Sequence, residues 1–264
     1  MRYAIAYSKK DLAGINIIEN IKKLAFSPQI PIIELSKETI YSEDLDKHPK
    51  LKEVDFLIFA SKHQSEKKEK SLSLHAPGNF MNATHGGQSG KVCNTSAFVL
   101  KYLFQQLNKN AENDNLSDYN ITLECTHHGP LINKPCCFIE IGSTEEQWKD
   151  KQAGEIIAKT ILSLNDFNNH YDFIPCIGIG GPHYCPNFNK IQLNTNYAIS
   201  HIIPEYNLPL TESMLFEAEK KTQEQIKFVL LDWKGLGNSE SRTQTIALIE
   251  HLGFKHLRTS GVEK

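Results

Sequence analysis

The sequence predicts an α/β protein whose mostly parallel sheet is covered by helices on both faces. Two observations predict this class. Short apolar runs typical of buried strands alternate along the chain with longer segments in which apolar residues recur at helical spacing. In addition, a His or Glu stands where several of these runs give way to loops, which is the position from which side chains of open α/β sheets usually reach a ligand.

The first half of the chain alternates strands and helices. Residues 2–8 predict a strand, and Asp11 can cap the helix that follows it. The apolar face expected for this helix consists of Leu12, Ile15, Ile18 and Leu24. Residues 30–35 and 54–60 predict buried parallel strands, and residues 71–75 predict a third. The charged residues 62–70 between the last two strands are expected to be solvated.

The second half continues the alternation. Asn94 or Thr95 can cap a helix that runs through Leu107, after which the polar residues 108–118 predict an exposed loop. Ser143 and Glu146 have the spacing of a capping box, so a helix through Trp148 and Ile161 should start there. The remaining predicted strands are 120–126, 136–141, 173–179, 197–203 and 227–232, and the remaining predicted helices are 214–221 and 243–252.

The composition indicates a globular protein in a reducing compartment. With 264 residues, of which 40% are hydrophobic, the chain can bury a substantial core, and because no linker divides it we expect one domain over residues 1–264. The formal charge of -2 leaves any contact with RNA to a local basic patch. The cysteines include no C-x-x-C pair, and no apolar run approaches the roughly 20 residues that span a bilayer. We therefore expect a cytoplasmic protein without a membrane segment.

Histidines and one glutamate mark the ends of the predicted strands. On a regular strand His127 and His128 would point to opposite faces, so only one of them should face a given ion unless Gly129 and Pro130 have already turned the chain. Glu140 ends an apolar strand, and a carboxylate there must be paired, solvated or bound to a metal because burying it alone is costly. His183 comes soon after Gly180 and Gly181, where backbone can approach a ligand closely. His63 follows a predicted strand, and His75 ends the strand predicted at 71–75.

Imidazole and carboxylate groups are a usual ligand set for zinc. A catalytic zinc site keeps three protein ligands and an open position for water, whose pKa falls to about 7. The H-E-x-x-H signature does not occur in this chain, so the hypothesis of a metal site depends only on the meeting of several strand ends. Histidines that only form hydrogen bonds in a core, or that bind substrate directly, remain the alternative.

Basic residues cluster at three places along the chain. The clusters are Lys62, Lys67, Lys68 and Lys70, then Lys220, Lys221 and Lys227, and finally Lys255, Arg258 and Lys264. A solvated surface explains such a cluster, and so does a site for phosphate groups. If the lysines bind phosphate, replacing one of them should weaken the binding of all RNA sequences alike. It should also lower the slope of log K against log salt by about one unit.

Five ordered motifs resemble those of the archaeal and plant type of D-aminoacyl-tRNA deacylase. They are SKH at 61–63, LHAPGN at 74–79, THHGP at 126–130, EIGSTEEQW at 140–148 and GIGGPHY at 178–184. The resemblance implies a hydrolase that cuts the ester between a D-amino acid and the terminal ribose of tRNA, with Zn²⁺ as cofactor. We also expect a monomer, and no protein partner is implied. The implied fold is a three-layer αβα structure with a mostly parallel or mixed central sheet, phosphorylase/hydrolase-like and similar to peptidyl-tRNA hydrolase.

The resemblance also assigns roles to individual residues. The catalytic residues would be His128, Glu140 and His183, and the metal ligands His127, His128, His183 and Glu140. The substrate-binding residues would be Lys62, His63, His75, Gly180 and Gly181.

The expected reaction is attack on the ester carbonyl by water that zinc has activated. Glu140 or a second His would move the proton to the ribose oxygen, and amides of the glycine turns would bind the oxyanion. An L side chain would be excluded by steric conflict. Two alternatives are a metal-dependent peptidase or phosphorylase that acts on a small molecule, and an RNA-binding protein without catalytic activity.

Overall fold

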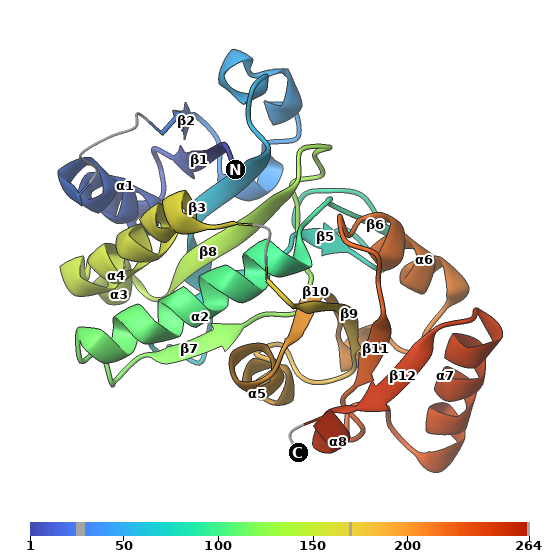
Figure 1. Cartoon of the computed structure of the whole chain (residues 1–264). Coiled ribbons are helices and arrows are strands. Elements are labelled where there is room, and N and C mark those ends of the chain that lie inside the picture. The colour runs from blue at the N-terminus through green and yellow to red at the C-terminus, as the bar shows by residue number, and fades with distance from the viewer. Residues whose placement is uncertain (25–29, 169–170, 263–264) are drawn as a thin grey trace.

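Most strands of the protein lie in two sheets (Figure 1). The computed structural model describes residues 1–24, 30–168 and 171–262. The strands are β1 (Tyr3–Ser8), β2 (Ile32–Leu35), β3 (Phe56–Gln64), β4 (Ser71–His75), β5 (Gly78–Asn79), β6 (Lys91–Val92), β7 (Asn120–Leu123), β8 (Cys136–Ser143), β9 (Ile174–Ile179), β10 (Tyr197–Ile203), β11 (Phe228–Leu231) and β12 (Lys255–Arg258). A six-stranded sheet has the order β2-β1-β3-β8-β4-β7, and a four-stranded sheet has the order β10-β9-β11-β12.

Helices connect most of these strands. The α-helices are α1 (Leu12–Leu24), α2 (Ala97–Asn113), α3 (Glu145–Trp148), α4 (Lys151–Leu162), α5 (Pro186–Asn194), α6 (Glu212–Lys220), α7 (Ser239–His251) and α8 (Thr259–Val262). The 3₁₀ helices are η1 (Thr39–Tyr41), η2 (Leu45–Lys47), η3 (Pro49–Leu51), η4 (Ser163–Asp166) and η5 (Glu205–Asn207). None of the described helices combines the length and the apolarity needed to cross a bilayer.

The six-stranded sheet is mixed, as the α/β prediction allowed. Strands β2, β1, β3 and β8 run parallel, whereas β4 is antiparallel to β8 and parallel to β7. The four-stranded sheet is parallel throughout. The predicted α/β class is therefore confirmed. The reversal of β4 matters for the site, because it brings His75 beside Phe138 of β8.

Both faces of the six-stranded sheet are buried. The face that carries Ile58 packs against α1, α2 and α4 in one apolar cluster. Phe59, on the opposite face, lies in a second cluster with Leu45 of η2 and Leu51 of η3. Burial on both sides explains why the strands read as continuous apolar runs in the sequence.

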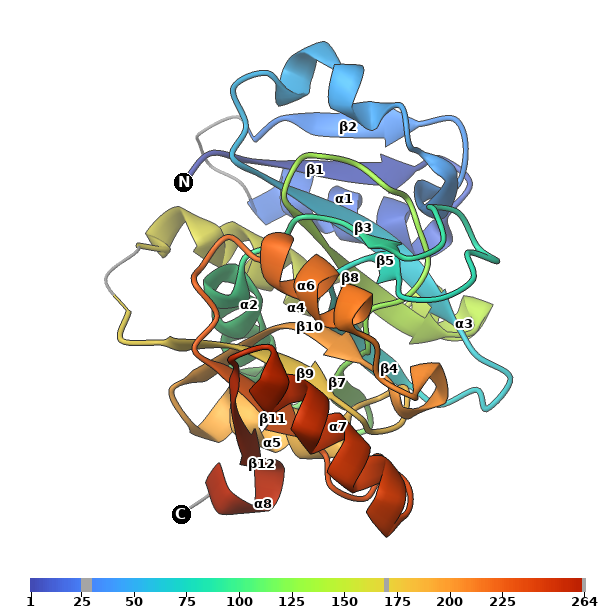
Figure 2. The same ribbon diagram turned by 90° about the vertical axis from the view of Figure 1, so that its right-hand side faces the viewer.

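Helices cover both faces of the four-stranded sheet (Figure 2). Leu230 of β11 shares a cluster with Phe188 of α5, and α2 also packs against β10 on this side. Val229, on the other face, shares a cluster with Leu215 of α6 and Ile249 of α7. Because α2 contacts β7 as well as β10, the same helix packs against both sheets.

The buried stripe of helix α1 agrees with the predicted one only in part. Ile18 is buried as expected, but Ile17 is buried as well and Leu12 is 36% exposed. The reason is the close approach of the helix to β3 at Gly14. A Cβ atom at that glycine would lie only 2.7 Å from the carbonyl oxygen of Ala60, so this contact fixes which side of the helix faces the sheet.

Two helix boundaries also differ from the prediction. Asp11 caps α1 as expected, since its Oδ1 accepts from Ala13 N at 2.9 Å. Ser96, rather than Asn94 or Thr95, caps α2 by accepting from Val99 N at 3.2 Å. The same helix continues to Asn113, so the first part of the loop predicted at 108–118 is helical; buried Ala111 explains the extension.

The helix predicted from Ser143 through Ile161 is two helices, α3 and α4. Strand β8 continues to Ser143, which moves the capping box to Thr144 and Gln147; Thr144 N donates to Gln147 Oε1 at 3.2 Å. Asn16 of α1 holds the junction between the helices. Its Nδ2 donates to the carbonyl oxygens of Trp148 at 3.1 Å and Asp150 at 2.6 Å.

Replacing Asn16 by Ala should lower the free energy of unfolding by about 1–3 kcal/mol, because the carbonyl oxygen of Trp148 loses its donor and that of Asp150 keeps only the N–H of Gly154. Urea unfolding of the purified protein measures this change. Glu19→Ala is the matched control on the same helix, since its ion pair with Lys151 is exposed and should contribute little. Equal effects of the two substitutions would contradict the role given to Asn16.

Candidate active site

The floor of the site is one face of three neighbouring strands. Ser61 of β3 lies opposite Glu140 of β8, which in turn lies opposite Ser73 of β4. Directly paired residues point to the same side of a sheet, and side chains alternate along each strand. His63 and His75 therefore lie on the same face as Glu140, beside the stacked rings of Phe59 and Phe138. The face is apolar at one end and polar at the other.

Two of the predicted strand ends are in fact strand interiors. His63 was expected after a strand that ended at Ala60, but β3 runs to Gln64. Glu140 was expected at the end of its strand, but β8 runs to Ser143. Part of the charged segment 62–70, which was expected to be solvated, therefore belongs to the sheet. Pairing of β3 with β8 explains the extension, since the register continues through Gln64 and Ser143.

Both His127 and His128 face the site, contrary to the expectation for a regular strand. Strand β7 ends at Leu123, and the chain then leaves the sheet; Cys125 N donates to the carbonyl oxygen of His183 at 2.9 Å. His128 adopts a left-handed backbone conformation with φ of 45°. This irregular backbone brings the two imidazole rings to a centroid distance of 4.3 Å.

A large pocket opens above this floor. Its volume is about 1570 Å³, and its lining includes His63, His127, His128, Glu140 and His183. His75 lies beneath it and is only 2% exposed. Four of the histidines assigned from the sequence and Glu140 therefore meet at the pocket, with the fifth histidine directly below.

Lys62 is part of the pocket lining, whereas Gly180 and Gly181 are not. Lys62 Nζ is 3.2 Å from Glu38 Oε1 and 5.3 Å from the centre of the Trp148 ring. The N–H of Gly180 already donates to the carbonyl oxygen of Ile203 at 2.8 Å, so it is not available to bind an oxyanion. Both glycines have positive φ, 89° and 86°, and they form the turn that leads to His183.

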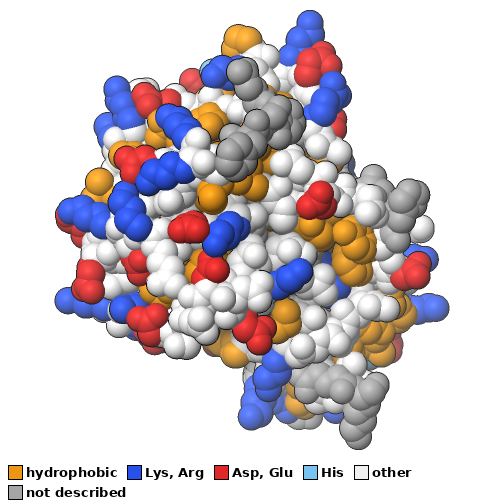
Figure 3. Space-filling view, turned by 60° about the vertical axis from the view of Figure 1, so that its left-hand side comes forward, with side chains coloured by type: hydrophobic (Ala, Val, Ile, Leu, Met, Phe, Trp, Pro, Cys, Tyr) orange, Lys and Arg blue, Asp and Glu red, His pale blue; other side chains and the backbone are white. Residues whose placement is uncertain are grey.

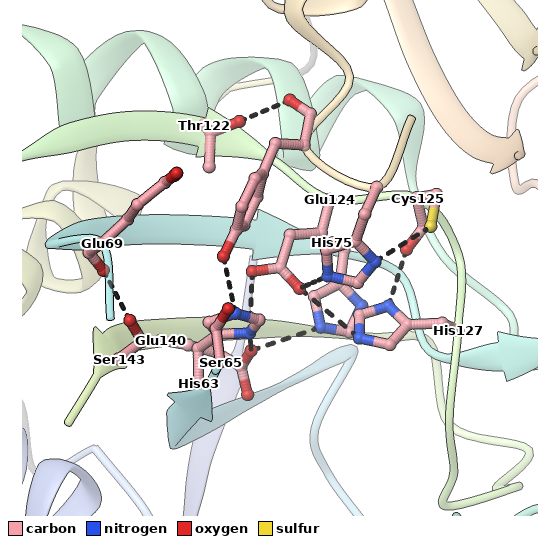
Figure 4. A network of polar contacts seen from close by, with 12 residues as sticks. His63, Ser65, Glu69, His75, Thr122, Glu124, Cys125, His127, Glu140 and Ser143 are labelled. Carbon is pink, nitrogen blue, oxygen red and sulfur yellow. Dashed lines mark hydrogen bonds and ion pairs between the residues drawn. The ribbon is translucent and has the colours of Figure 1, made fainter. Parts of the chain in front are cut away.

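Glu124 is the buried centre of a charged network that the sequence analysis did not select (Figure 4). Its Oε1 lies 3.1 Å from His63 Nδ1, and its Oε2 lies 3.1 Å from His183 Nε2 and 3.4 Å from His127 Nε2. Burial alone would raise the pKa of this carboxyl, but the contacts with His183 and His63 outweigh burial and hold the pKa well below its usual range. Glu124 is therefore ionised.

The charge of Glu124 also changes its histidine partners. Burial would lower the pKa of His183, but contacts with Cys125 and Glu124 raise it to about 10. The pKa of His63 is raised as well, because contacts with Glu124 exceed the effect of burial. Tyr184 supports this group, since its hydroxyl lies 2.9 Å from His63 Nε2. The signal in the sequence for Glu124 was a carboxylate within an apolar strand, the same signal that identified Glu140.

Three other imidazoles share a common arrangement. The Nδ1 atoms of His75, His127 and His128 lie 3.2, 2.8 and 2.7 Å from the carbonyl oxygens of Ala76, Cys125 and Gly129. A carbonyl oxygen only accepts, so each Nδ1 carries the hydrogen and each Nε2 keeps a free lone pair in the neutral ring. Burial and neighbouring imidazoles lower the pKa of His127 well below its usual range and that of His128 to about 3.

These three histidines can hold a metal ion. One ring nitrogen from each lies within 4.8 Å of the others, and His75 Nε2 is buried without a hydrogen-bond partner in the described part of the chain. His75 Nε2 lies 3.6 Å from Glu140 Oε2, and His127 Nε2 lies 3.4 Å from Glu124 Oε2. In each pair two hydrogen-bond acceptors face each other, which is unfavourable. A cation bound between them would remove this repulsion. A metal-binding His usually donates its other N–H to a carbonyl, as all three do here.

The ligand set expected from the sequence differs from this cluster. Among the described residues, no group of mutually close ligand atoms contains His127, His128, His183 and Glu140 together. His75, which was expected to bind substrate, joins His127 and His128 instead. His183 belongs with Glu124 and His63, or with Cys125 and His127.

Comparison with known proteins identifies the family. The sequence profile described as D-aminoacyl-tRNA deacylase matches residues 50–257, a span that contains the histidines and both buried glutamates of the site. The chain belongs to the D-aminoacyl-tRNA deacylase family. The resemblance seen in the five sequence motifs is thereby confirmed.

Relatives in the D-aminoacyl-tRNA deacylase family match along nearly their whole length. A D-aminoacyl-tRNA deacylase of Thermococcus onnurineus is 35% identical, covering 96% of this chain and 98% of the relative. One of Methanocaldococcus jannaschii is 34% identical, covering 97% and 98%. The crystal structure of a conserved protein of unknown function superposes with a TM-score of 0.89 at 29% identity, covering 99% of this chain and 96% of that one.

Replacing Glu124 by Gln should lower the pKa of His183, because the negative charge that favours the imidazolium is lost. NMR titration of the ring in metal-depleted protein measures this pKa. His183 of the parent protein should stay charged through neutral pH and lose its proton only as the pH rises toward 10. Glu146→Gln, an exposed carboxylate outside the network, is the control. An unchanged titration of His183 in Glu124→Gln would contradict the network.

Proposed function

We propose that this protein hydrolyses the ester bond of D-aminoacyl-tRNA and releases the D-amino acid from the terminal ribose. The observation that carries the proposal is the meeting of three imidazoles and two carboxyl groups at and directly beneath one pocket, within the segment that matches the deacylase family. Such a site can activate water against an acyl bond, which is the chemistry that deacylation needs. The cytoplasm, where tRNA is charged, is the expected compartment.

His75, His127 and His128 are the residues that would hold zinc. Neutral imidazole nitrogen is a preferred zinc ligand, and three protein ligands are typical of a catalytic zinc site. When bound, zinc supplies Lewis-acid activation of water near neutral pH. The lowered pKa values of His127 and His128 favour this use, because a protonated imidazole cannot bind a metal.

Glu140 is the residue placed to transfer a proton. Its Oε2 lies 3.6 Å from His75 Nε2 and 3.8 Å from His63 Nδ1, at the floor of the pocket. Burial raises its pKa, and the nearby charge of Glu124 raises it further. A carboxyl with a raised pKa can take a proton from the attacking water and return it to the departing ribose oxygen.

His63 and His183 keep positive charge beside the reacting atoms. Their raised pKa values depend on contacts with Glu124, and the side chain of His183 is 34% exposed toward the pocket. A fixed positive charge stabilises the negative charge that develops on the ester carbonyl oxygen. We therefore assign to these imidazoles the role that the sequence had suggested for the glycine amides. Selection of the D-amino acid is proposed to follow from steric exclusion of the L side chain.

Purified protein should hydrolyse intact D-aminoacyl-tRNA, lose this activity with a chelator and regain it with zinc. His75→Asn should lose bound zinc together with activity, because a ligand is removed. His183→Asn should keep zinc and lose about 10²-fold or more in rate, because only charge and proton chemistry are affected. Elemental analysis and a deacylation assay measure both quantities.

His251→Asn, an exposed histidine of α7, is the control for this experiment and should change neither quantity. Zinc retained by His75→Asn, or zinc lost by His183→Asn, would contradict the assigned ligand set. Absence of hydrolysis by the zinc-loaded parent protein would contradict the proposed activity itself.

Two lysines at the pocket can neutralise phosphates of the tRNA. Lys67 and Lys68 are exposed, line the pocket and have no ion-pair partner among the described residues. On the side of α1 and α4, by contrast, lysines, arginines and acidic residues are interspersed (Figure 3). A local basic patch is what a chain of net charge -2 needs to bind RNA.

Replacing both Lys67 and Lys68 by Gln should weaken tRNA binding and lower the slope of log K against log salt by about two units, because two phosphate contacts are lost. Fluorescence anisotropy over a salt series measures the slope. Lys22→Gln with Lys23→Gln, in the last turn of α1, is the matched control. The same change of slope in both double variants would show that only overall charge matters.

A further inference from the structure

We infer that the ring of Tyr206 is the surface on which the 3′-terminal base of the tRNA stacks. The inference rests on the proposed function, which requires the terminal nucleotide at this pocket. Tyr206 lies in η5, directly after β10, and it is both part of the pocket lining and 57% exposed. An exposed aromatic ring at the mouth of a site is a suitable platform for a nucleic-acid base.

The hydroxyl of Tyr206 fixes the ring to the catalytic cluster. It lies 2.9 Å from the Sγ atom of Cys125, which is fully buried. The carbonyl oxygen of the same cysteine accepts from His127 Nδ1 at 2.8 Å, and its Sγ lies 3.6 Å from His183 Nδ1. One end of Tyr206 is therefore anchored next to two histidines of the site, while its ring extends toward solvent.

The ring is also free to accept a base. Within the described part of the chain, Tyr206 makes no contact with another aromatic ring and no cation lies over it. Trp148 also lines the pocket, but Lys62 Nζ lies 5.3 Å from its ring centre and its Nε1 donates to the carbonyl oxygen of His63 at 3.0 Å. Phe80 is buried, and the ring of Tyr184 packs against those of His63 and His183. The ring of Tyr206 therefore has a face that is free to stack on a base, whereas the ring of Trp148 is already in contact with Lys62.

Covalent geometry places the base near this ring. The scissile ester joins the amino acid to the terminal ribose, and the base is attached to the same sugar. When the ester carbonyl reaches His127 and His183, the base has to remain at the pocket mouth, within a nucleoside's reach of these two imidazoles. The anchored ring of Tyr206 occupies this position, since its hydroxyl reaches the cysteine that contacts both histidines. Stacking would bind the nucleotide without any contact with the amino acid side chain.

The test uses Tyr206→Leu and Tyr206→Phe with D-aminoacyl minihelices that have or lack the terminal base. Loss of one stacked base corresponds to about 5- to 150-fold in affinity. Tyr206→Leu should raise KM by about this factor on the complete substrate and leave kcat within about twofold. Tyr206→Phe keeps the ring and loses only the hydroxyl that anchors it, so its KM should lie between those of the parent protein and of Tyr206→Leu. Tyr41→Leu, an exposed tyrosine outside the pocket lining, is the control and should have no effect.

The KM values measured on the minihelix that lacks the terminal base provide the decisive test. The parent protein should lose about the same factor in KM on this substrate, and Tyr206→Leu should add no further loss. Equal losses for Tyr206→Leu on both substrates would overturn the inference, and so would a loss that appears with D-Phe but disappears with D-Ala, since the ring would then bind the amino acid side chain.

Binding of the uncharged minihelix, measured by anisotropy, separates this inference from the proposed function. If the parent protein binds more tightly than Tyr206→Leu only when the terminal base is present, stacking is supported even if no hydrolysis occurs. If the enzyme hydrolyses its substrate but neither binding nor KM depends on Tyr206, stacking is refuted and the activity stands.

Discussion

The site depends on one constraint. Three imidazoles donate their Nδ1–H groups to backbone carbonyl oxygens, which leaves the other ring nitrogen of each without a hydrogen and available to a metal ion. The carbonyl groups belong to Ala76, Cys125 and Gly129, and each lies in irregular backbone just beyond a strand or in the loop after it. Irregular backbone is needed because regular strand would consume these carbonyls in the sheet and would send neighbouring histidines to opposite faces. The early end of β7 and the left-handed His128 are therefore part of the chemistry.

The two buried carboxyl groups of the site have different environments and hence different tasks. Glu124 contacts His63, His127 and His183, so its pKa is held low and it stays charged. Glu140 has no comparable set of donors, and burial together with Glu124 raises its pKa. Carboxyl groups whose pKa values are pushed apart in this way commonly divide electrostatic and proton-transfer roles. In the proposed mechanism Glu124 orders and charges the histidines, and Glu140 exchanges the proton.

Local patterns in the sequence predicted much of the fold and most of the residues that meet at the site. Apolar runs located the strands, Asp11 marked the start of α1, and the motifs brought His63, His75, His127, His128, His183 and Glu140 together. The partners of each residue could not be predicted, because they depend on contacts between distant segments. The reversal of β4 brings His75 to the floor, and the contact of Cys125 with the loop of His183 turns the chain after β7. Neither contact has a signal at helical or strand spacing, so the ligand set was assigned differently. Glu124 itself was visible as a carboxylate in a predicted strand, but its histidine partners were not.

The central claim is that the inward nitrogens of His75, His127 and His128 form the zinc site, while His183 and the carboxyl groups serve the reaction around it. X-ray absorption spectroscopy at the zinc edge of the loaded protein tests this most directly, because the imidazole scattering pattern reports the number and kind of ligands. The account predicts three imidazole nitrogens and no sulfur in the first coordination shell. A shell that contains the sulfur of Cys125, or fewer than three imidazoles, would contradict it.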